Sequence, residues 1–278
     1  MGIIVPGEGT TLKELRDFVR QRLDDFALPY RHTETGDGNW TQVSLPHYPV
    51  VAESVSVTVD DVAETVTAAL DSGIVTFSSA PADQAVVLFA YSAYRFSDSE
   101  VNEAIGGAVD ELYPHFYVTD LDTTLSTTSG TYEYTLPACE VVTGVEFRAS
   151  ASEPWMSVKA RRYAVVRHGT TKYLKLHDDP GSGSLRLSLV TRPASFAADG
   201  DAIEDIGLPG RACGPIISYA CWRLLNDKLA ARVQSNAAVA VQEQGAATVL
   251  DYQRTINLFR IQFESELALK QMHPWSAR

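Results

Sequence analysis

The stretch from Ala212 to Val233, ACGPIISYACWRLLNDKLAARV, constrains the fold more than any other part of the sequence. Its apolar residues recur at helical spacing on more than one side, and charged residues enter only in its second half. Pro215 stands in the first turn, where a missing N–H costs least. Burying six such apolar side chains is worth on the order of 10 kcal/mol gross, at about 1.5–3 kcal/mol each. Other helices must therefore cover this one.

Three further amphipathic helices are predicted, and they are far apart in the sequence. Two begin at capping boxes, T-x-x-E at Thr11 and S-x-x-E at Ser97, and the third is the long final helix. Their apolar stripes are Leu12, Leu15, Val19, Leu23 and Phe26; Val101, Ile105, Val109, Leu112 and Phe116; and Val249, Tyr252, Ile256, Phe259, Phe263 and Leu267. We expect all three to pack with the helix at 212–233.

Between the helices the apolar period changes from helical spacing to two, which is typical of strands. Strands are predicted first at 55–59, 74–77 and 86–94, with a return strand at 65–70; the stretch 63–70 also fits a short helix. A second group is predicted at 132–136, 141–147, 155–158, 163–166, 173–176 and 185–190. The sequence therefore indicates two antiparallel β units.

Together these elements predict an α+β fold in which a four-helix bundle core is interrupted by two antiparallel β insertions. The polar links HTETGDGN and TDLDTTLSTTSGT precede the two insertions. The predicted divisions are 1–36 for an N-terminal arm and the first helix, 37–96 for the first β insertion, 97–120 for the second helix, 121–208 for the second β insertion, and 209–278 for the last two helices and a C-terminal tail.

Composition limits the classes of partner. The net charge of -12 argues against bulk binding to nucleic acid or to an anionic membrane. No apolar run reaches the roughly 20 residues that a membrane-spanning helix needs, and the N-terminal segment lacks the features of a signal peptide. The three cysteines form no disulfide framework, so we interpret them as small core residues in a reducing compartment.

A search for reactive chemistry finds little. The six histidines lie in unrelated contexts, and His177-Asp178-Asp179 is the one cluster with the character of metal ligands. Because a Pro-Gly turn follows it, a solvated turn is favoured over a metal site. No phosphate-binding glycine loop, nucleophile elbow, CxxC or HExxH motif is present. We therefore predict no catalytic residues, no metal, no cofactor and no enzymatic activity.

Charge is distributed unevenly along the chain. Residues 96–122 contain seven acids and no Lys or Arg, whereas residues 159–175 contain six bases and no acid. This pattern fits ordinary surface variation, and it equally fits two faces that meet between copies of the protein, head to tail, in a closed ring. Nucleic-acid binding by the basic stretch is a weaker interpretation, because stacking aromatic residues are not interleaved with the bases.

The overall layout resembles the head-to-tail connector proteins (adaptor or neck proteins) of tailed bacteriophages. The resemblance rests on TTLKELRDFVRQRL, on the β block that begins VSVTVDD and leads into the capped helix at Ser97, and on ISYACWRLLNDKLAARV followed by a long last helix. It implies a virion structural protein that forms a ring, usually a dodecamer, docked under the portal. DNA would pass through the lumen without sequence-specific binding, and a stopper or tail-completion protein would bind below.

The resemblance also implies a location and an attachment site. The protein would lie in the virion neck, between capsid and tail, after assembly in the host cytoplasm. In this family the last helix and tail commonly reach toward the portal, so Met272, His273, Pro274 and Trp275 are predicted to bind the portal, with Trp275 as the anchor. The alternative for these residues is a frayed chain end.

A competing hypothesis concerns the second β unit. Trp155, Tyr163 and Tyr173 are aromatic residues that could be exposed there. On this alternative the chain is a carbohydrate- or receptor-binding β module of a virion tail protein. A ring-forming adaptor and a binding module differ in oligomeric state, which makes the two separable by experiment.

Overall fold

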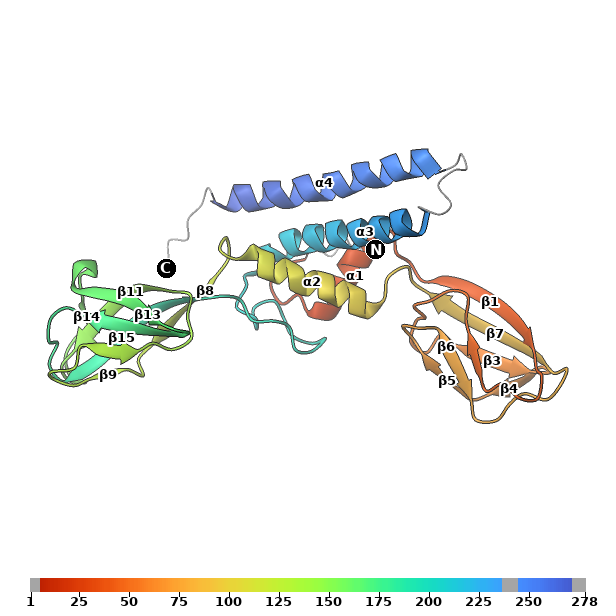
Figure 1. Ribbon diagram of the computed structural model, residues 1–278, viewed down its shortest axis with the longest axis horizontal. Coiled ribbons are helices and arrows are strands. Elements are labelled where there is room, and N and C mark those ends of the chain that lie inside the picture. The colour runs from red at the N-terminus through yellow and green to blue at the C-terminus, as the bar shows by residue number, and fades with distance from the viewer. Residues whose placement is uncertain (1–5, 237–244, 272–278) are drawn as a thin grey trace.

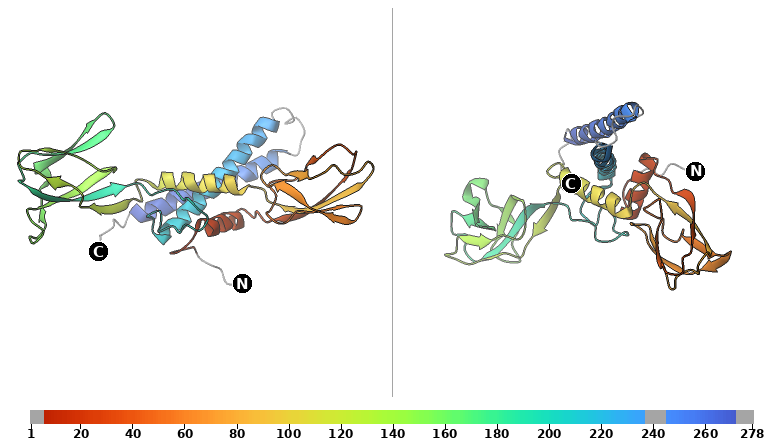
Figure 2. Two further views of the ribbon diagram at one scale, coloured as in Figure 1. Left: turned by 90° about the horizontal axis from the view of Figure 1, so that it is seen from below. Right: turned by 45° about the vertical axis from the view of Figure 1, so that its right-hand side comes forward.

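The computed structural model describes residues 6–236 and 245–271, and these form an elongated body (Figure 1). A layer of helices lies in the middle, with one β region at each end, and the same arrangement is seen in both further views (Figure 2). The helices are α1 (Leu12–Arg22), α2 (Asp98–Leu112), α3 (Cys213–Asn236) and α4 (Gly245–Gln271). None of these helices combines the length and hydropathy of a membrane-spanning segment.

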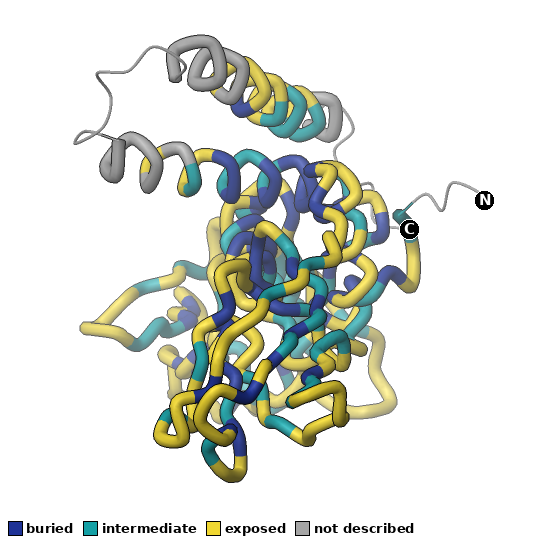
Figure 3. Tube along the Cα trace, turned by 90° about the vertical axis from the view of Figure 1, so that its right-hand side faces the viewer, coloured by how far each residue is buried: buried dark blue, intermediate teal, exposed yellow. Residues whose placement is uncertain are grey.

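The helical layer has its own core, formed around α3. Buried side chains from α1, α2 and α3 meet there, together with residues of the segment that returns from the second β region; they include Leu15, Val19, Ile105, Leu112, Ile203, Leu208, Ile216, Ile217, Cys221 and Leu224. The prediction that other helices cover the 212–233 stretch on more than one side is therefore confirmed. Helix α4 lies outermost, against α3 (Figure 3). Of its described side chains, Ile256 is buried, and Phe259, Phe263 and Leu267 are half-buried.

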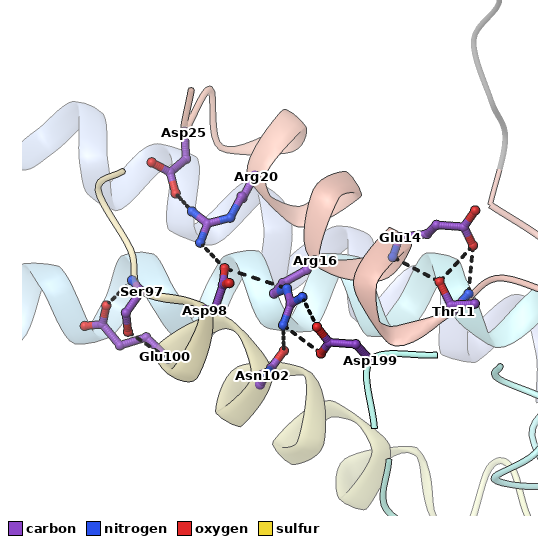
Figure 4. Close-up of polar contacts among 10 residues, drawn as sticks. All are labelled: Thr11, Glu14, Arg16, Arg20, Asp25, Ser97, Asp98, Glu100, Asn102 and Asp199. Carbon is purple, nitrogen blue, oxygen red and sulfur yellow. Dashed lines mark hydrogen bonds and ion pairs between the residues drawn. The ribbon is translucent and has the colours of Figure 1, made fainter. Parts of the chain in front are cut away.

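Both predicted capping boxes are present (Figure 4). In α1, the backbone N–H of Thr11 donates to the Glu14 carboxylate at 2.9 Å, and the Thr11 hydroxyl accepts from the Glu14 N–H at 3.3 Å. In α2, Ser97 and Glu100 make the same reciprocal pair at 2.7 and 3.0 Å. Each box satisfies N–H groups that a helix start leaves without partners, so both helices begin where the sequence predicts.

The first β region holds two antiparallel sheets with a shared core. Their strands are β1 (Leu28–Thr35), β2 (Gln42–Ser44), β3 (Ser56–Val59), β4 (Val62–Glu64), β5 (Val66–Ala69), β6 (Ile74–Phe77) and β7 (Val86–Ala93). The strand orders are β1-β7-β3-β4 and β2-β6-β5. Val57, Val75, Phe77, Val87 and Phe89 fill the space between the sheets. The stretch 63–70, which fitted a strand or a helix, overlaps the end of β4 and contains β5.

The second β region is built in the same way from two antiparallel sheets. Its strands are β8 (Val118–Asp122), β9 (Ser126–Thr127), β10 (Glu133–Thr135), β11 (Val141–Arg148), β12 (Met156–Ser157), β13 (Tyr163–His168), β14 (Thr171–Leu176) and β15 (Gly183–Thr191). The strand orders are β12-β11-β15-β8, with β9 also beside β15, and β10-β14-β13. Val145, Leu174, Leu185, Leu187 and Leu189 form its core. The six strands predicted between 132 and 190 are confirmed.

The predicted fold class, a four-helix bundle core with two antiparallel β insertions, is wrong. In its described residues the protein is mixed and mostly β, with four antiparallel sheets. The reason lies in how the apolar residues pack. Those of each β region pack on one another in a separate core instead of completing a helical core, and α4 adds an outer layer on α3.

Three smaller expectations are also corrected. Phe26 is 60% exposed, because α1 ends at Arg22 and its apolar stripe stops at Leu23. The segment predicted as the polar link before the first β unit begins within strand β1, which pairs with β7 along its whole length. The Ser/Thr-rich link predicted before the second β unit contains most of β8 and all of β9, and both strands pair with β15. Strands β1, β2 and β8, none of which was predicted, lie at sheet edges.

Residues 192–209, which we call the return segment, lead from β15 back to α3. Its backbone runs along the start of α1, where Leu12 N–H donates to Asp201 O at 3.0 Å and Ile203 N–H donates to Thr10 O at 3.0 Å. The Arg16 guanidinium donates two hydrogen bonds to the Asp199 carboxylate, at 3.0 and 2.8 Å (Figure 4). These contacts fix the second β region to the helical layer.

Candidate subunit interface

The acidic segment 96–122 contains carboxylates that form ion pairs within the subunit and carboxylates that do not. Three of its acids form ion pairs with bases on α1 or α3: Asp98 with Arg16 and Arg20, Glu100 with Lys228, and Glu103 with Arg223, at distances of 2.7–3.7 Å. Two others, Asp120 and Asp122 on β8, have no basic partner among the described residues. The carboxylates left over for an outside partner thus include this pair on β8.

The basic segment 159–175 is divided in the same way. Three of its bases are held within the second β region: Arg162 pairs with Asp178 at 3.5 Å, Lys175 pairs with Glu133 at 3.4 Å, and Lys172 donates to the backbone oxygens of Cys139 and Glu140. The other three are exposed and have no acidic partner within the described chain; they are Lys159, Arg161 and Arg167. They flank or belong to strand β13.

Unpaired acids therefore lie on one strand of the second β region, β8, and unpaired bases lie on or just before another strand, β13. Strand β8 is an edge of the sheet β12-β11-β15-β8, and β13 is an edge of the sheet β10-β14-β13. Each edge also presents an apolar side chain to solvent, Leu121 on β8 with 58% exposed and Val165 on β13 with 44% exposed. A surface of this composition, apolar with complementary charge, is suited to contact with another protein.

The cluster His177-Asp178-Asp179 has a structural role in the turn. The Asp179 carboxylate accepts hydrogen bonds from Gly181 N, Ser129 Oγ and Gly130 N at 2.9–3.0 Å, and these bonds lower the pKa of Asp179, with that from Gly181 contributing most. Asp178 pairs with Arg162. Within the described residues, no three His, Cys, Asp or Glu side chains are grouped so that they could hold a metal ion.

The three aromatic residues of the binding-module hypothesis do not form a common platform. The Trp155 ring is half-buried, and the guanidinium groups of Arg148 and Arg186 lie over it at 4.3 and 4.9 Å from its centroid. Tyr163 packs against the core of the second β region. Tyr173 makes an edge contact with the ring of His168. The three rings are thus engaged separately, each by other side chains of the second β region.

The cysteines lack the character of reactive thiolates. Burial raises the pKa of Cys221 to about 12 and also raises the pKa of Cys139. Cys139 lines an open depression of about 560 Å³ beside Lys172 and Arg192, but a protonated thiol is a poor nucleophile. Cys213 and Cys221 are buried in the helical layer. The interpretation of these two as small core residues is confirmed.

The ion network between α1, α2 and the return segment was not predicted from the sequence (Figure 4). Arg20 donates to Asp25 at 2.6 Å and to Asp98 at 2.7 Å, while Arg16 contacts Asp98 and Asp199. Two basic residues four apart on a helix, beside its apolar stripe, are the sequence signal that could have indicated it. This network joins α1 to α2 and to the return segment.

The predicted portal-binding residues Met272, His273, Pro274 and Trp275 lie outside the described residues. The described part of α4 does carry an apolar surface away from α3. Leu258 is 67% exposed and Ile261 is 60% exposed, one turn apart on the outer side of the helix. The helix before the tail thus has two apolar faces, one on α3 and one in solvent.

No protein-family model matches the chain, and a search of curated proteins finds no match. The class that the fold itself defines is a mixed, mostly antiparallel β protein with a helical layer between two β regions. On its surface, unpaired acids lie along the β8 edge and unpaired bases lie on and just before the β13 edge.

Proposed function

We propose that this protein is a virion structural protein, a head-to-tail adaptor that forms a ring under the portal of a tailed bacteriophage and joins the capsid to the tail. The observation that carries the proposal is the separation of unpaired acids on β8 from the unpaired bases on and just before β13 within one subunit. A subunit with both halves of a complementary contact associates head to tail, and such contacts close into a ring when the rotation between copies allows it.

The elongated shape supports the same role. A β region projects from each end of the helical layer, so that one subunit can touch neighbours on two sides while its helices form a continuous layer (Figure 2). In the proposed assembly, which we expect to be a dodecamer, one face meets the portal and the other meets a stopper or tail-completion protein. The ring lies in the virion neck and is assembled in the host cytoplasm.

The net charge of -12 suits a DNA conduit. A wall with an excess of carboxylates repels phosphates, so DNA passes through the lumen without being held and without sequence-specific binding. Twelve copies of the chain multiply this excess around the proposed channel. The basic groups on β13 are reserved in this proposal for contact between subunits.

The C-terminal tail is the proposed attachment to the portal. Met272, His273, Pro274 and Trp275 follow α4, and Pro274 cannot continue a helix. A tryptophan repeated on every subunit of a ring makes a multivalent apolar collar, in which each docked copy raises the effective concentration of the next. A few contacts worth about 1–3 kcal/mol each are then enough to hold the ring.

The oligomeric state is the first test of the proposal. Light scattering after size exclusion, with electron microscopy of the same fractions, should reveal a ring of many copies, either for the protein alone or on portal-bearing capsids. The complex should weaken as salt rises, because exposed charge contacts are screened. A protein that stays monomeric at every salt concentration and does not join portal-bearing capsids would contradict the proposal.

A truncation tests the attachment. Removal of residues 274–278 should leave the thermal melt of the subunit unchanged, since the tail follows the last described helix, but it should prevent joining to portal-bearing capsids. Replacement of Trp275 alone by Ala should give most of the same loss. If the truncated protein joins capsids at the normal level, the attachment lies elsewhere on the subunit.

A further inference from the structure

Two edge strands of the second β region expose backbone groups of known direction. In an antiparallel ladder, alternate residues of a strand bond to opposite sides, so each edge strand has a free row of N–H and C=O groups. The sheet orders make β8 and β13 edges, and neither pairs with the other in the same subunit.

On β13 the free row consists of Tyr163, Val165 and Arg167. His177 N–H donates to Arg162 O at 2.9 Å, so Arg162 and the residues that alternate with it bond toward β14. The residues between them therefore direct their backbone groups away from the sheet. Lys172 O, opposite Arg167 in the register, accepts from Leu136 on the far side of β14, which agrees with this assignment.

On β8 the outward row includes Thr119 and Leu121, and the N–H of Leu121 is already bonded within the subunit. Leu121 N–H donates to the Asp120 carboxylate at 2.8 Å and does not enter the ladder with β15. Val190, opposite Thr119 in the register, has its O bonded to Glu140 N–H on the β11 side at 2.7 Å. Thr119 and Leu121 thus face outward from the sheet, beside the unpaired carboxylates of Asp120 and Asp122.

Charge decides which edges can pair. Two β8 edges would bring Asp120 and Asp122 of one copy against the same acids of another, and two β13 edges would oppose Arg161 and Arg167 in the same way. Like charges directly across a strand pair are destabilising, whereas opposite charges stabilise it. Of the three combinations, the pairing of β8 with β13 has complementary charge, and it also covers the exposed Leu121 and Val165.

We infer that β8 of one copy adds to the free edge of β13 of the next copy, so that the sheet β10-β14-β13 continues across the subunit boundary. The occupant of each edge is a second copy of this chain, and the contact is head to tail. Backbone hydrogen bonds supply the pairing, and the charges set the choice of partner. The inference rests on the proposed function, since it assigns the contact between subunits of the proposed ring.

Cysteine cross-linking tests the pairing directly. In a Cys139→Ser background, the full-length chain is given Leu121→Cys and Val165→Cys together, assembled and oxidised. A ladder of disulfide-linked multimers is expected from the double variant. A matched control carries Val62→Cys with Val165→Cys, because Val62 is 68% exposed on β4 in the first β region, and it should give no ladder.

Charge reversal provides a second, independent readout. Asp120→Lys and Arg167→Glu should each weaken assembly at least about tenfold, because opposed like charges cost more than one factor of ten in affinity. The two changes combined should restore assembly. Neither residue has an ion-pair partner among the described residues of its own subunit, so the melting temperature of each variant should stay close to that of the unmodified chain.

The outcomes separate this inference from the proposed function. A ring that forms without a cross-linked ladder and is unaffected by either charge reversal would overturn the pairing of β8 with β13 and leave the adaptor proposal standing. A chain that forms no ring, alone or on portal-bearing capsids, would overturn both. A ladder that the double variant forms and the Val62 control does not would support the inference.

Discussion

Replacement of Asp25 by Ala should destabilise the protein strongly, because this carboxylate is buried and joins two parts of the fold. Its side chain is 1% exposed. One oxygen accepts from Arg20 on α1 at 2.6 Å, and the other accepts from the backbone N–H of Arg95, between β7 and α2, at 2.6 Å. The carboxylate therefore fixes the exit of the first β region to the helical layer.

The size of the effect follows from what the substitution leaves behind. Removing one partner of a buried ion pair typically costs about 3–5 kcal/mol, since the other charge stays buried. Arg20 keeps Asp98 at 2.7 Å and the ring of Tyr94 at 3.8 Å, so we expect about 3 kcal/mol, at the lower end of that range. Asp25→Asn should cost less, because its amide oxygen can still accept from Arg95 N–H.

Thermal and urea unfolding followed by circular dichroism measure this difference. A loss of about 3 kcal/mol corresponds to a fall of roughly 6–12 °C in the melting temperature of a chain this long. Asp17→Ala is the matched control, because Asp17 is exposed on α1 and a surface change of this kind stays within about 0.5 kcal/mol. If Asp25→Ala melts like the Asp17 control, the pairing of Asp25 does not stabilise the fold.

Gly106→Ala in α2 should raise stability by about 0.5–1 kcal/mol in thermal melts, because an added methyl group meets nothing within 4 Å. Gly107→Ala should be less stable than Gly106→Ala, since its methyl group would collide with the Arg223 guanidinium; equal melting points would contradict this. Cys221, with its pKa raised to about 12, should resist a thiol reagent at pH 8 until the protein is unfolded, and rapid labelling of the native protein would show that it is accessible. The hydrogen bond from Arg16 lowers the pKa of Asp199 in the folded protein. The ionised Asp199 therefore stabilises the fold fully above its pKa in the unfolded chain, about 3.9, and this stabilisation is lost as the pH falls through the lower pKa of the folded protein. Asp199→Asn should slightly reduce the fall of stability between about pH 5 and pH 3, and an unchanged pH profile would contradict the role of the pair.

Local signals in the sequence identify many helices and strands, but they do not show which of these pack together in one hydrophobic core. The capping boxes at Thr11 and Ser97 and the stripes behind them are read from neighbouring residues, and the structure contains both helices. The alternation at Val57 and at Leu187 marks strands with one buried face. It does not say whether that face meets helices or another sheet, and this is why the predicted fold class is wrong.

Edge strands and internal ion pairs could not be predicted from the sequence, for physical reasons. β1 and β8 lack clear alternation of apolar and polar residues, because an edge strand leaves much of its surface in solvent. The uneven distribution of charge is visible in the sequence. The sequence does not show which charges are neutralised, because Asp98 comes within reach of Arg16 and Arg20 only when α1 and α2 pack together. The free edges therefore became evident only from the structure.

The helical layer draws its core from segments that are far apart in the chain, and this has a consequence for synthesis. The Cys221 thiol contacts Val19 O across 202 positions of sequence, and Ile256 is added later still. Each β region spans a continuous stretch, so during translation both can fold before α3 leaves the ribosome. The apolar stripes of α1 and α2 cannot pack against α3 before α3 is synthesised. Until then they stay uncovered on the nascent chain, where chaperones can bind them.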